Sequence, residues 1–351
     1  MKKSLIIAGL ACVALAACTK NEVVSVAPDQ EITFQTAINK ASTRALISST
    51  AYPTDVPFGT FAYFYPNTFG TETTLYINNA EVKNATSATS GSAWTTTPAY
   101  YWPKNGKLTF YSYSPYSISS EVSCESTTGL TITNHDVNAN QTVDVMVADR
   151  IDNQTANGAN VGYTGVPTIF RHKLAQIVNI TFKTDKNYKA GPIAAGSKQF
   201  FINQVDIKGV KQQATYTSGK DVDGTHLGSW STATGSNDYV YFKEATSNST
   251  EFTNTATELS GKQLIMPQTL SDTDDTKFVI KYTIRTYSSA SASAYSDDVV
   301  TVEVPLYNAL STSHAFAMNK KYTFNFTIGL DQIYWAPSVV EWETDIDTIS
   351  F

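Results

Sequence analysis

Short segments in which apolar and polar residues alternate recur along this chain, and they constrain its fold more than any other feature. In the segment EITFQTAI, Ile32, Phe34 and Ile38 fall on one face, whereas Thr33 and Gln35 fall on the other. This two-residue period is typical of a β-strand with one buried face. Comparable segments span residues 57–65, 107–116, 142–149, 176–184, 200–210, 238–245, 277–287, 299–307, 320–330 and 338–346.

The connections between these segments predict the fold class. They are rich in Ser, Thr, Gly, Asn and Asp, which favour turns, and no sustained helical period follows the first 17 residues. Aromatic residues make up 12% of the chain and charged residues 16%, a balance that favours strands. We therefore expect an all-β protein of two tandem β-sandwich domains, because 351 residues suffice for two cores. A polar stretch at 150–166 predicts domains spanning 31–162 and 163–351.

The N-terminus predicts export as a lipoprotein. Two lysines precede the apolar run Leu5–Ala17, which is too short for a transmembrane helix, so residues 1–17 read as a signal peptide. The end of this run, Leu15–Cys18, resembles a bacterial lipobox. The thiol of the lipobox cysteine, here Cys18, would become acylated, with palmitate among the acyl chains. Residues 18–30 would then form a lipidated tether to the outer membrane. The alternative is an ordinary secretory signal with a chance cysteine.

Cysteines and charge narrow the function classes. Cys12 lies in the signal peptide and Cys18 would carry lipid, which leaves Cys124 without a partner for an intrachain disulfide. The net charge of −6 gives no electrostatic case for nucleic-acid binding.

The sequence carries no recognisable catalytic or metal-binding motif. The four histidines show no metal-ligand spacing, and nucleophile-elbow, phosphate-loop and dinucleotide motifs are missing. Asp221, Asp223 and Gly224 resemble the opening of a calcium loop without its distal glutamate, so we expect a solvated turn. We therefore predict no enzymatic activity, no cofactor and no metal. Distant carboxylates that converge on a glycoside stay an open alternative.

An aromatic cluster has two interpretations. Exposed rings could stack on sugars, whereas alternating rings could fill a sandwich core, which is the interpretation we favour. The residues concerned are Trp94, Tyr100, Tyr101, Trp102, Phe110, Tyr111 and Tyr113.

Several segments, taken in order, resemble the fimbrillin family of pilus subunits from Bacteroidales-type bacteria. The lipobox and EITFQTAI are followed by KASTRAL, which contains Arg44, and then by Trp94 with YYWP and LTFYSYSPY. The later matching segments are DVMVAD at 144–149, FRHKLAQIVNITF at 170–182, LIMPQTL at 264–270, NKKYTFNFTI and the terminal VVEWETDI.

The resemblance implies transthyretin-like sandwich domains and a mode of assembly. Subunits of this family reach the outer membrane as lipoproteins, and an arginine-specific protease then removes the lipidated N-terminus with the first strand. Cleavage between Arg44 and Ala45 would remove Ile32, Phe34 and Ile38 and leave an apolar groove. A strand from another subunit would enter this groove, giving a head-to-tail fimbria that supports adhesion.

The terminal segment is the candidate donor strand. Val340, Trp342, Thr344 and Ile346 alternate with period two, whereas the apolar residues beyond them fall on the opposite parity, so the register past Ile346 stays open. Two alternatives remain at this stage: an uncleaved anchor subunit that keeps its first strand, and a monomeric outer-membrane lipoprotein that binds glycans through rings such as Trp94 or Trp230.

Overall fold

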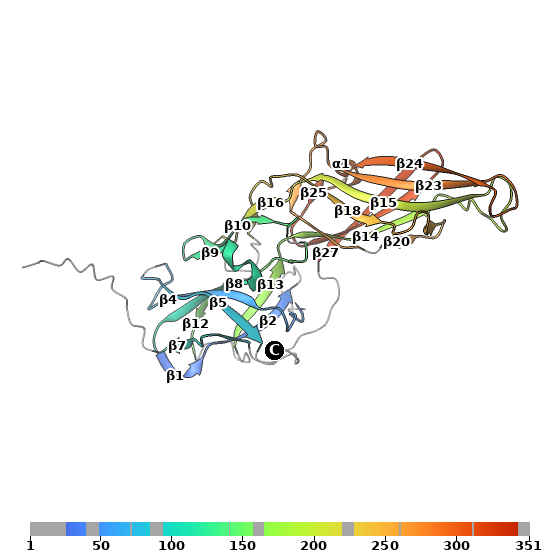
Figure 1. Ribbon diagram of the computed structural model, residues 1–351. Helices are drawn as coiled ribbons and strands as arrows, with labels where there is room; N and C mark the ends of the chain where they lie inside the picture. Colours follow the sequence, from blue (N-terminus) through green and yellow to red (C-terminus); the bar gives the residue numbers. More distant parts are fainter. Residues whose placement is uncertain are drawn as a thin grey trace, which may run out of the picture.

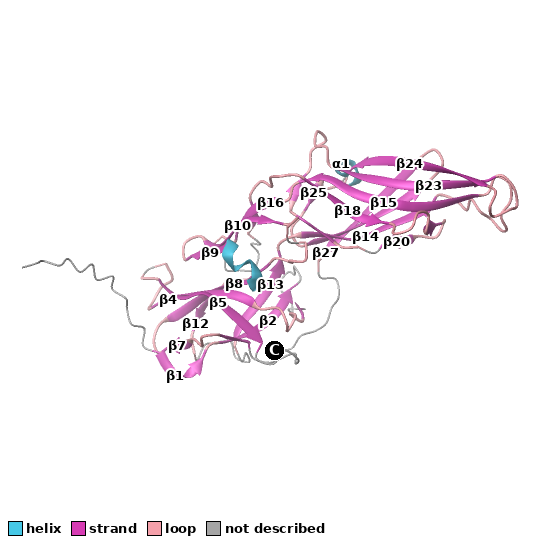
Figure 2. Ribbon diagram, viewed as in Figure 1, coloured by secondary structure: helices cyan, strands magenta, loops and turns pink. Residues whose placement is uncertain are grey.

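The computed structural model describes residues 26–39, 49–70, 72–84, 94–139, 141–156, 165–219, 228–259, 261–310 and 312–342. The chain forms two β-rich lobes in an elongated arrangement, with its first half in one lobe and most of its second half in the other (Figure 1). Strands account for nearly all of the regular structure (Figure 2), which confirms the all-β prediction of tandem sandwiches.

The elements of the first half run from β1 to β13. They are β1 (Val26–Glu31), β2 (Thr33–Asn39), β3 (Ser49–Thr50), β4 (Phe58–Tyr65), β5 (Thr74–Asn84), β6 (Trp94–Thr96), β7 (Tyr101–Pro103), β8 (Lys107–Ser114), the 3₁₀ helix η1 (Tyr116–Glu121), β9 (Val122–Glu125), β10 (Gly129–Asp136), β11 (Met146–Ala148), β12 (Ile151–Gln154) and β13 (Val166–His172).

The elements of the second half run from β14 to β27. They are β14 (Ala175–Thr184), β15 (Lys198–Val210), β16 (Gln213–Thr217), β17 (Ser229–Trp230), β18 (Asn237–Lys243), β19 (Thr250–Phe252), β20 (Thr257–Leu259), β21 (Gln263–Ile265), β22 (Gln268–Thr269), β23 (Lys277–Tyr287), β24 (Tyr295–Pro305), α1 (Leu306–Ala309), β25 (Ala315–Phe316), β26 (Lys320–Ile328) and β27 (Ile333–Glu341). Neither helix found in the described ranges is long and apolar enough to cross a membrane.

The N-terminal sandwich is a nine-stranded sheet that closes on itself. Its strand order is β11-β13-β2-β6-β5-β4-β8-β12, with β3 also paired to β2. β11 pairs with β8 as well, which completes a ring. Alternation along β4 buries both faces of this strand, and Phe58, Ala62 and Phe64 point into the enclosed N-terminal core. The intervening Phe61 and Tyr63 point outward, where they are covered by a second apolar cluster.

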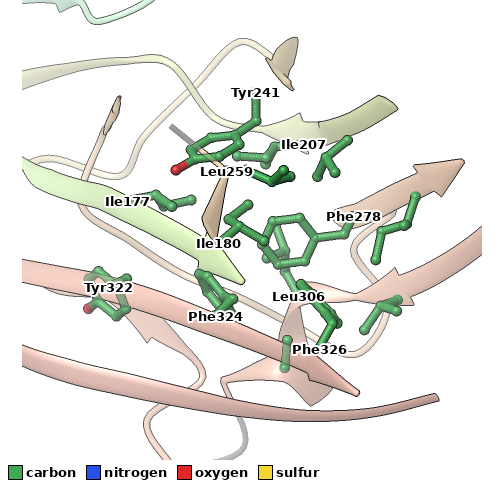
Figure 3. Close-up of a cluster of buried hydrophobic side chains, with 14 of the residues drawn as sticks. Ile177, Ile180, Ile207, Tyr241, Leu259, Phe278, Leu306, Tyr322, Phe324 and Phe326 are labelled. Atoms are coloured by element: carbon green, nitrogen blue, oxygen red, sulfur yellow. The ribbon is translucent and has the colours of Figure 1, made fainter. Parts of the chain in front are cut away.

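The C-terminal sandwich packs two five-stranded sheets face to face. One sheet has the order β20-β14-β26-β27 with β21 also on β14, and the other has the order β18-β15-β23-β24 with β19 on β15. In β26, Tyr322, Phe324 and Phe326 are each at most 1% exposed and fill the C-terminal core between the sheets (Figure 3). β27 is the edge strand of its sheet, a position used below.

A four-stranded sheet joins the two halves. Its order is β17-β16-β10-β9, so each half of the chain supplies two strands. This sheet helps cover what we call the junction core, which contains Tyr111 and Tyr113 of β8, Tyr216 of β16 and, from far along the chain, Met266 and Trp342. The two sandwiches therefore share a core in addition to having one each.

Strand pairing bears on where one domain ends. β13 pairs with β2 and β11 in the N-terminal sheet, and β14 begins the C-terminal sandwich. We propose that the division lies between His172 and Ala175, later than the 162/163 boundary expected from the sequence.

Candidate assembly site

The predicted first strand, β2, is a fully integrated member of the N-terminal sheet. It runs parallel to β13, with Phe34 opposite Val166 and Ile38 opposite Phe170, and it runs antiparallel to β6 on its other side. Ile32, Phe34 and Ile38 are 0%, 1% and 7% exposed, so all three predicted side chains lie in the N-terminal core.

Phe34 makes the central contacts of this strand. Its ring centroid lies 5.6 Å from that of Phe58 and 5.7 Å from that of Phe110, both in edge-to-face geometry. Burial of such a side chain contributes roughly 1.5–3 kcal/mol. Withdrawal of β2 would therefore expose two more rings as well as its own, which makes the vacated space strongly apolar.

The backbone around β2 would also lose partners if the strand left. The N–H of Ile32 donates to the carbonyl of Tyr100 over 2.8 Å, and β1 pairs with β7 immediately before β2. Because β13 and β6 flank β2, its removal would turn both into open edges. Such edges carry unpaired N–H and C=O groups and accept an added strand.

A glycine permits the close approach of β13 to β2. A Cβ placed on Gly165, just before β13, would lie 2.9 Å from the backbone carbon and oxygen of Thr33. Real side chains do not approach backbone atoms so closely, hence the start of the groove depends on the missing side chain at this position.

Trp342 lies in the junction core, away from the N-terminal groove. Trp342 is 5% exposed, and its backbone N–H donates to the carbonyl of Asn319 over 3.1 Å. Its indole ring stacks on the His172 imidazole with centroids 4.3 Å apart. Lys321 Nζ lies 5.9 Å from the Trp342 ring centroid, and Asp144 Oδ2 lies 2.8 Å from His172 Nδ1. The sequence predicted Trp342 as a donor residue but contained no local signal for this pairing with His172.

The remaining predicted assembly residues divide into two groups. Val340 lies on β27 and is 42% exposed. Cys18, Arg44, Ala45, Thr344 and Ile346 lie outside the described residues.

Most rings of the aromatic cluster support the core interpretation, whereas Tyr101 is 36% exposed. Trp94 is 4% exposed and packs in the N-terminal core, and Phe110, Tyr111 and Tyr113 are buried too. Trp230 is partly buried and donates its indole N–H to the carbonyl of Lys173 over 2.6 Å. The glycan-binding alternative thus loses Trp94 as an exposed ring.

The other candidate reactive groups have structural partners. His135 is fully buried with Nδ1 2.7 Å from Glu121 Oε2, and burial raises the pKa of the Cys124 thiol to about 12, which favours its protonated form. In the loop after β22, the Asp274 carboxylate accepts a hydrogen bond from the backbone N–H of Ser271. The calcium-like residues Asp221 and Asp223 lie outside the described ranges, and within those ranges no cluster of metal-ligating side chains occurs.

A polar pocket of about 470 Å³ lies at one end of the C-terminal sandwich. Most of its charged groups form ion pairs: Lys277 Nζ lies 2.9 Å from carboxylate oxygens of Asp275 and Glu303, and Lys208 Nζ lies 3.4 Å from Asp238. We therefore treat it as a structural network of ion pairs.

Comparison with known proteins identifies the family to which this chain belongs. Residues 43–342 match the model of the fimbrillin-like family. The chain belongs to the fimbrillin-like family. No curated protein matches this fimbrillin-like chain.

Two solved structures are similar to the fimbrillin-like chain in fold. A fimbrial protein from Bacteroides vulgatus is 19% identical with a TM-score of 0.63, the similarity covering 90% of this chain and all of that one. A putative cell adhesion protein from Bacteroides uniformis is 15% identical with a TM-score of 0.53, again over 90% of this chain and all of that one. Family membership supports the role of a structural subunit of a cell-surface fimbria that assembles with other fimbrial subunits.

Proposed function

We propose that this chain is a fimbrial structural subunit that polymerises by donor-strand exchange after arginine-specific removal of its first strand. It would be exported to the outer membrane as a lipoprotein acylated on Cys18, cut between Arg44 and Ala45, and joined head-to-tail to other copies. No catalytic group is required, since β-pairing and apolar side chains hold such a fibre together. The burial of Ile32, Phe34 and Ile38 in the N-terminal core, where all three are at most 7% exposed, is the observation that carries the proposal.

The closed sheet explains why processing would control assembly. While β2 occupies its place, the ring has no gap at that position, so a strand of a second copy cannot pair there. Cleavage after Arg44 would detach β1 and β2 covalently from the rest of the chain. β13 stays attached to β8 through β11, so the rim of the vacated groove keeps its support.

The burial of Trp342 refines the donor segment. Because its ring packs against His172 of its own chain, we propose that the strand donated to the next copy begins at Glu343, with Thr344 and Ile346 as its first alternating residues and Ile349 or Phe351 beyond them. Trp342 would then be the fixed root of the donor strand.

The N-terminal sequence and intact mass of surface-derived protein, before and after treatment with an arginine-specific protease, test the processing step. We expect a start at acylated Cys18 before treatment and at Ala45 afterwards, accompanied by SDS-resistant ladders. The variant Arg44→Gln should keep the lipidated start and give no ladder, whereas the matched variant Lys40→Gln should behave as the parent. Persistence of the Cys18 start in the parent would identify an uncleaved anchor subunit instead.

Deletion of residues 343–351 tests the donor step. The truncated chain should be exported and processed normally but form no ladders, because its own groove opens while it has no strand to give. Ladders from the truncated chain alone would refute the donor assignment.

A further inference from the structure

Exposed apolar side chains concentrate on one short stretch of the chain. Of the ten exposed large hydrophobic residues among those that the structure describes, five lie within residues 330–340. They are Leu330, Tyr334, Trp335, Val339 and Val340, with exposed fractions of 45%, 57%, 37%, 45% and 42%. We call these five residues the β27 patch. Exposed apolar side chains that gather along one edge of a soluble protein favour an interaction site there.

The patch exists because the C-terminal sandwich is open along β27. Trp335 pairs with Phe326 and Val339 pairs with Tyr322, so both lie on the core-facing side of the sheet. Their partners are each 1% exposed, yet Trp335 and Val339 themselves are more than a third exposed. The opposite sheet therefore stops short of covering this edge.

The outer side of β27 carries apolar side chains, whereas the outer side of the neighbouring strand β26 is polar. Tyr334 and Val340 lie on this side, opposite Thr327 and Lys321. The residues between those two on β26, Thr323 and Asn325, continue the polar surface. Both sides of one edge strand thus present apolar side chains to solvent.

The middle of β27 argues against a further strand as the occupant. Pro337 stands at the centre of the strand and has no N–H to donate to an added neighbour. Packing of side chains is the contact that this edge supports.

The start of the proposed donor strand identifies the occupant, if the proposed donor-strand exchange holds. The donated strand would begin at Glu343, two residues after β27 ends at Glu341. Two residues reach at most about 7 Å when fully extended. The groove of the next copy must then lie beside Trp342, directly after β27 ends at Glu341.

We propose that the β27 patch packs against the N-terminal sandwich of the next copy in the filament, as a second contact alongside the donated strand. This inference rests on the function proposed above. The N-terminal sandwich offers matching surface: in the described part of its residues the exposed large hydrophobic side chains are Leu75 and Tyr101. Tyr101 lies on β7, whose partner β1 is removed by the proposed cleavage.

Two matched valine variants test the patch. Val340 of β27 and Val299 of the other edge strand, β24, are both exposed, at 42% and 71%. Both Val340→Asp and Val299→Asp should keep the parent's melting temperature, since neither side chain is buried. After arginine-specific cleavage, polymers of the Val340→Asp variant should grow at least tenfold more slowly than those of the parent. Polymers of the Val299→Asp variant should grow at the parent's rate.

A photo-reactive amino acid at position 340 gives the occupant directly. Cross-links in assembled fibres should join position 340 to the N-terminal sandwich of a second copy, and the same probe at position 299 should not. Equal polymerisation rates for the two aspartate variants, or cross-links from position 340 to another C-terminal sandwich, would overturn the patch while leaving donor-strand exchange intact. A parent chain that is cut but forms no polymer would overturn both proposals.

Discussion

The indole of Trp342 stacks on the imidazole of His172, with ring centroids 4.3 Å apart and planes inclined by 17°. His172 ends β13, the strand that lies parallel to β2, whereas Trp342 directly follows β27 near the end of the chain. One stacked pair therefore connects a wall of the proposed groove with the root of the proposed donor strand. The two sites through which a subunit would meet its neighbours are fixed relative to each other within one chain.

Replacement of Trp342 by alanine should destabilise the folded chain. Truncation of a buried tryptophan leaves a cavity in the junction core and costs about 3–5 kcal/mol. Urea unfolding should show this loss, whereas Trp335→Ala, at a position that is 37% exposed, should cost much less. Equal losses of unfolding free energy in the two variants would mean that the stacking of Trp342 on His172 does not stabilise the folded chain.

The Phe34→Ala change should destabilise the uncut chain but have no effect on the stability of the chain from which β2 has been removed. Its ring contacts Phe58 and Phe110, so we expect a loss of about 3–5 kcal/mol in the chain that retains β2. After cleavage at Arg44 and removal of the detached segment, the variant and the parent should unfold identically. In an Arg44→Gln background the difference should survive protease treatment, and its disappearance there would place the cut elsewhere.

A side chain at position 165 should push β13 away from β2. A Cβ there meets the Thr33 backbone at 2.9 Å, so Gly165→Ala should cost about 1–3 kcal/mol in the uncut chain, as overpacking does. Gly329→Ala is the comparison, because a Cβ there would lie farther away, at 3.2 Å or more from the Gln332 carbonyl oxygen and the Asp185 carboxylate. Thermal unfolding of both variants measures the difference, and a Gly165→Ala chain as stable as the parent would show that the strands can separate freely.

Lys173 predicts a pH dependence of stability. Burial lowers the pKa of this lysine to about 7, and its Nζ lies 5.5 Å from the Tyr216 ring centroid in the junction core. Between pH 7 and the ordinary lysine pKa near 10.5, the unfolded chain binds a proton that the folded chain does not. Stability should therefore rise with pH across this window and carry the full penalty of a buried charge below pH 7.

Comparison with Lys173→Met isolates this contribution. The parent should gain stability relative to the variant as the pH is raised from 7 to 9.5 in parallel urea titrations, because methionine has no proton to release. A constant difference between the two chains over that range would contradict a lowered lysine pKa.

The sequence was sufficient for features that depend on local pattern. The alternation in EITFQTAI predicted which side of β2 is buried, and Ile32, Phe34 and Ile38 all lie in the N-terminal core. Alternation in β26 likewise separates the buried Phe324 and Phe326 from the outward Asn325. Such patterns are readable because a strand with one buried face imposes its own period.

Features that depend on distant pairing were beyond the sequence. Ring closure relies on β11, a three-residue strand that pairs with both β8 and β13, and three residues carry no recognisable period. Trp342 was predicted as a donor residue because it shares the parity of Val340. No local pattern distinguishes a side chain that packs in the core of its own chain from one that enters the groove of another copy. The exposed β27 patch was missed for a related reason, because alternation does not reveal whether a facing sheet reaches the edge.

The junction core draws on side chains from Phe61 to Trp342, almost the full span of the chain. A polypeptide delivered with its N-terminus first can form the ring around Phe34 long before this shared core has all its parts. Trp342 is the last member of this core along the chain. The two sandwiches can therefore be fully joined only after Trp342 has been made, and a chain that stops before this residue would be left with its halves imperfectly joined.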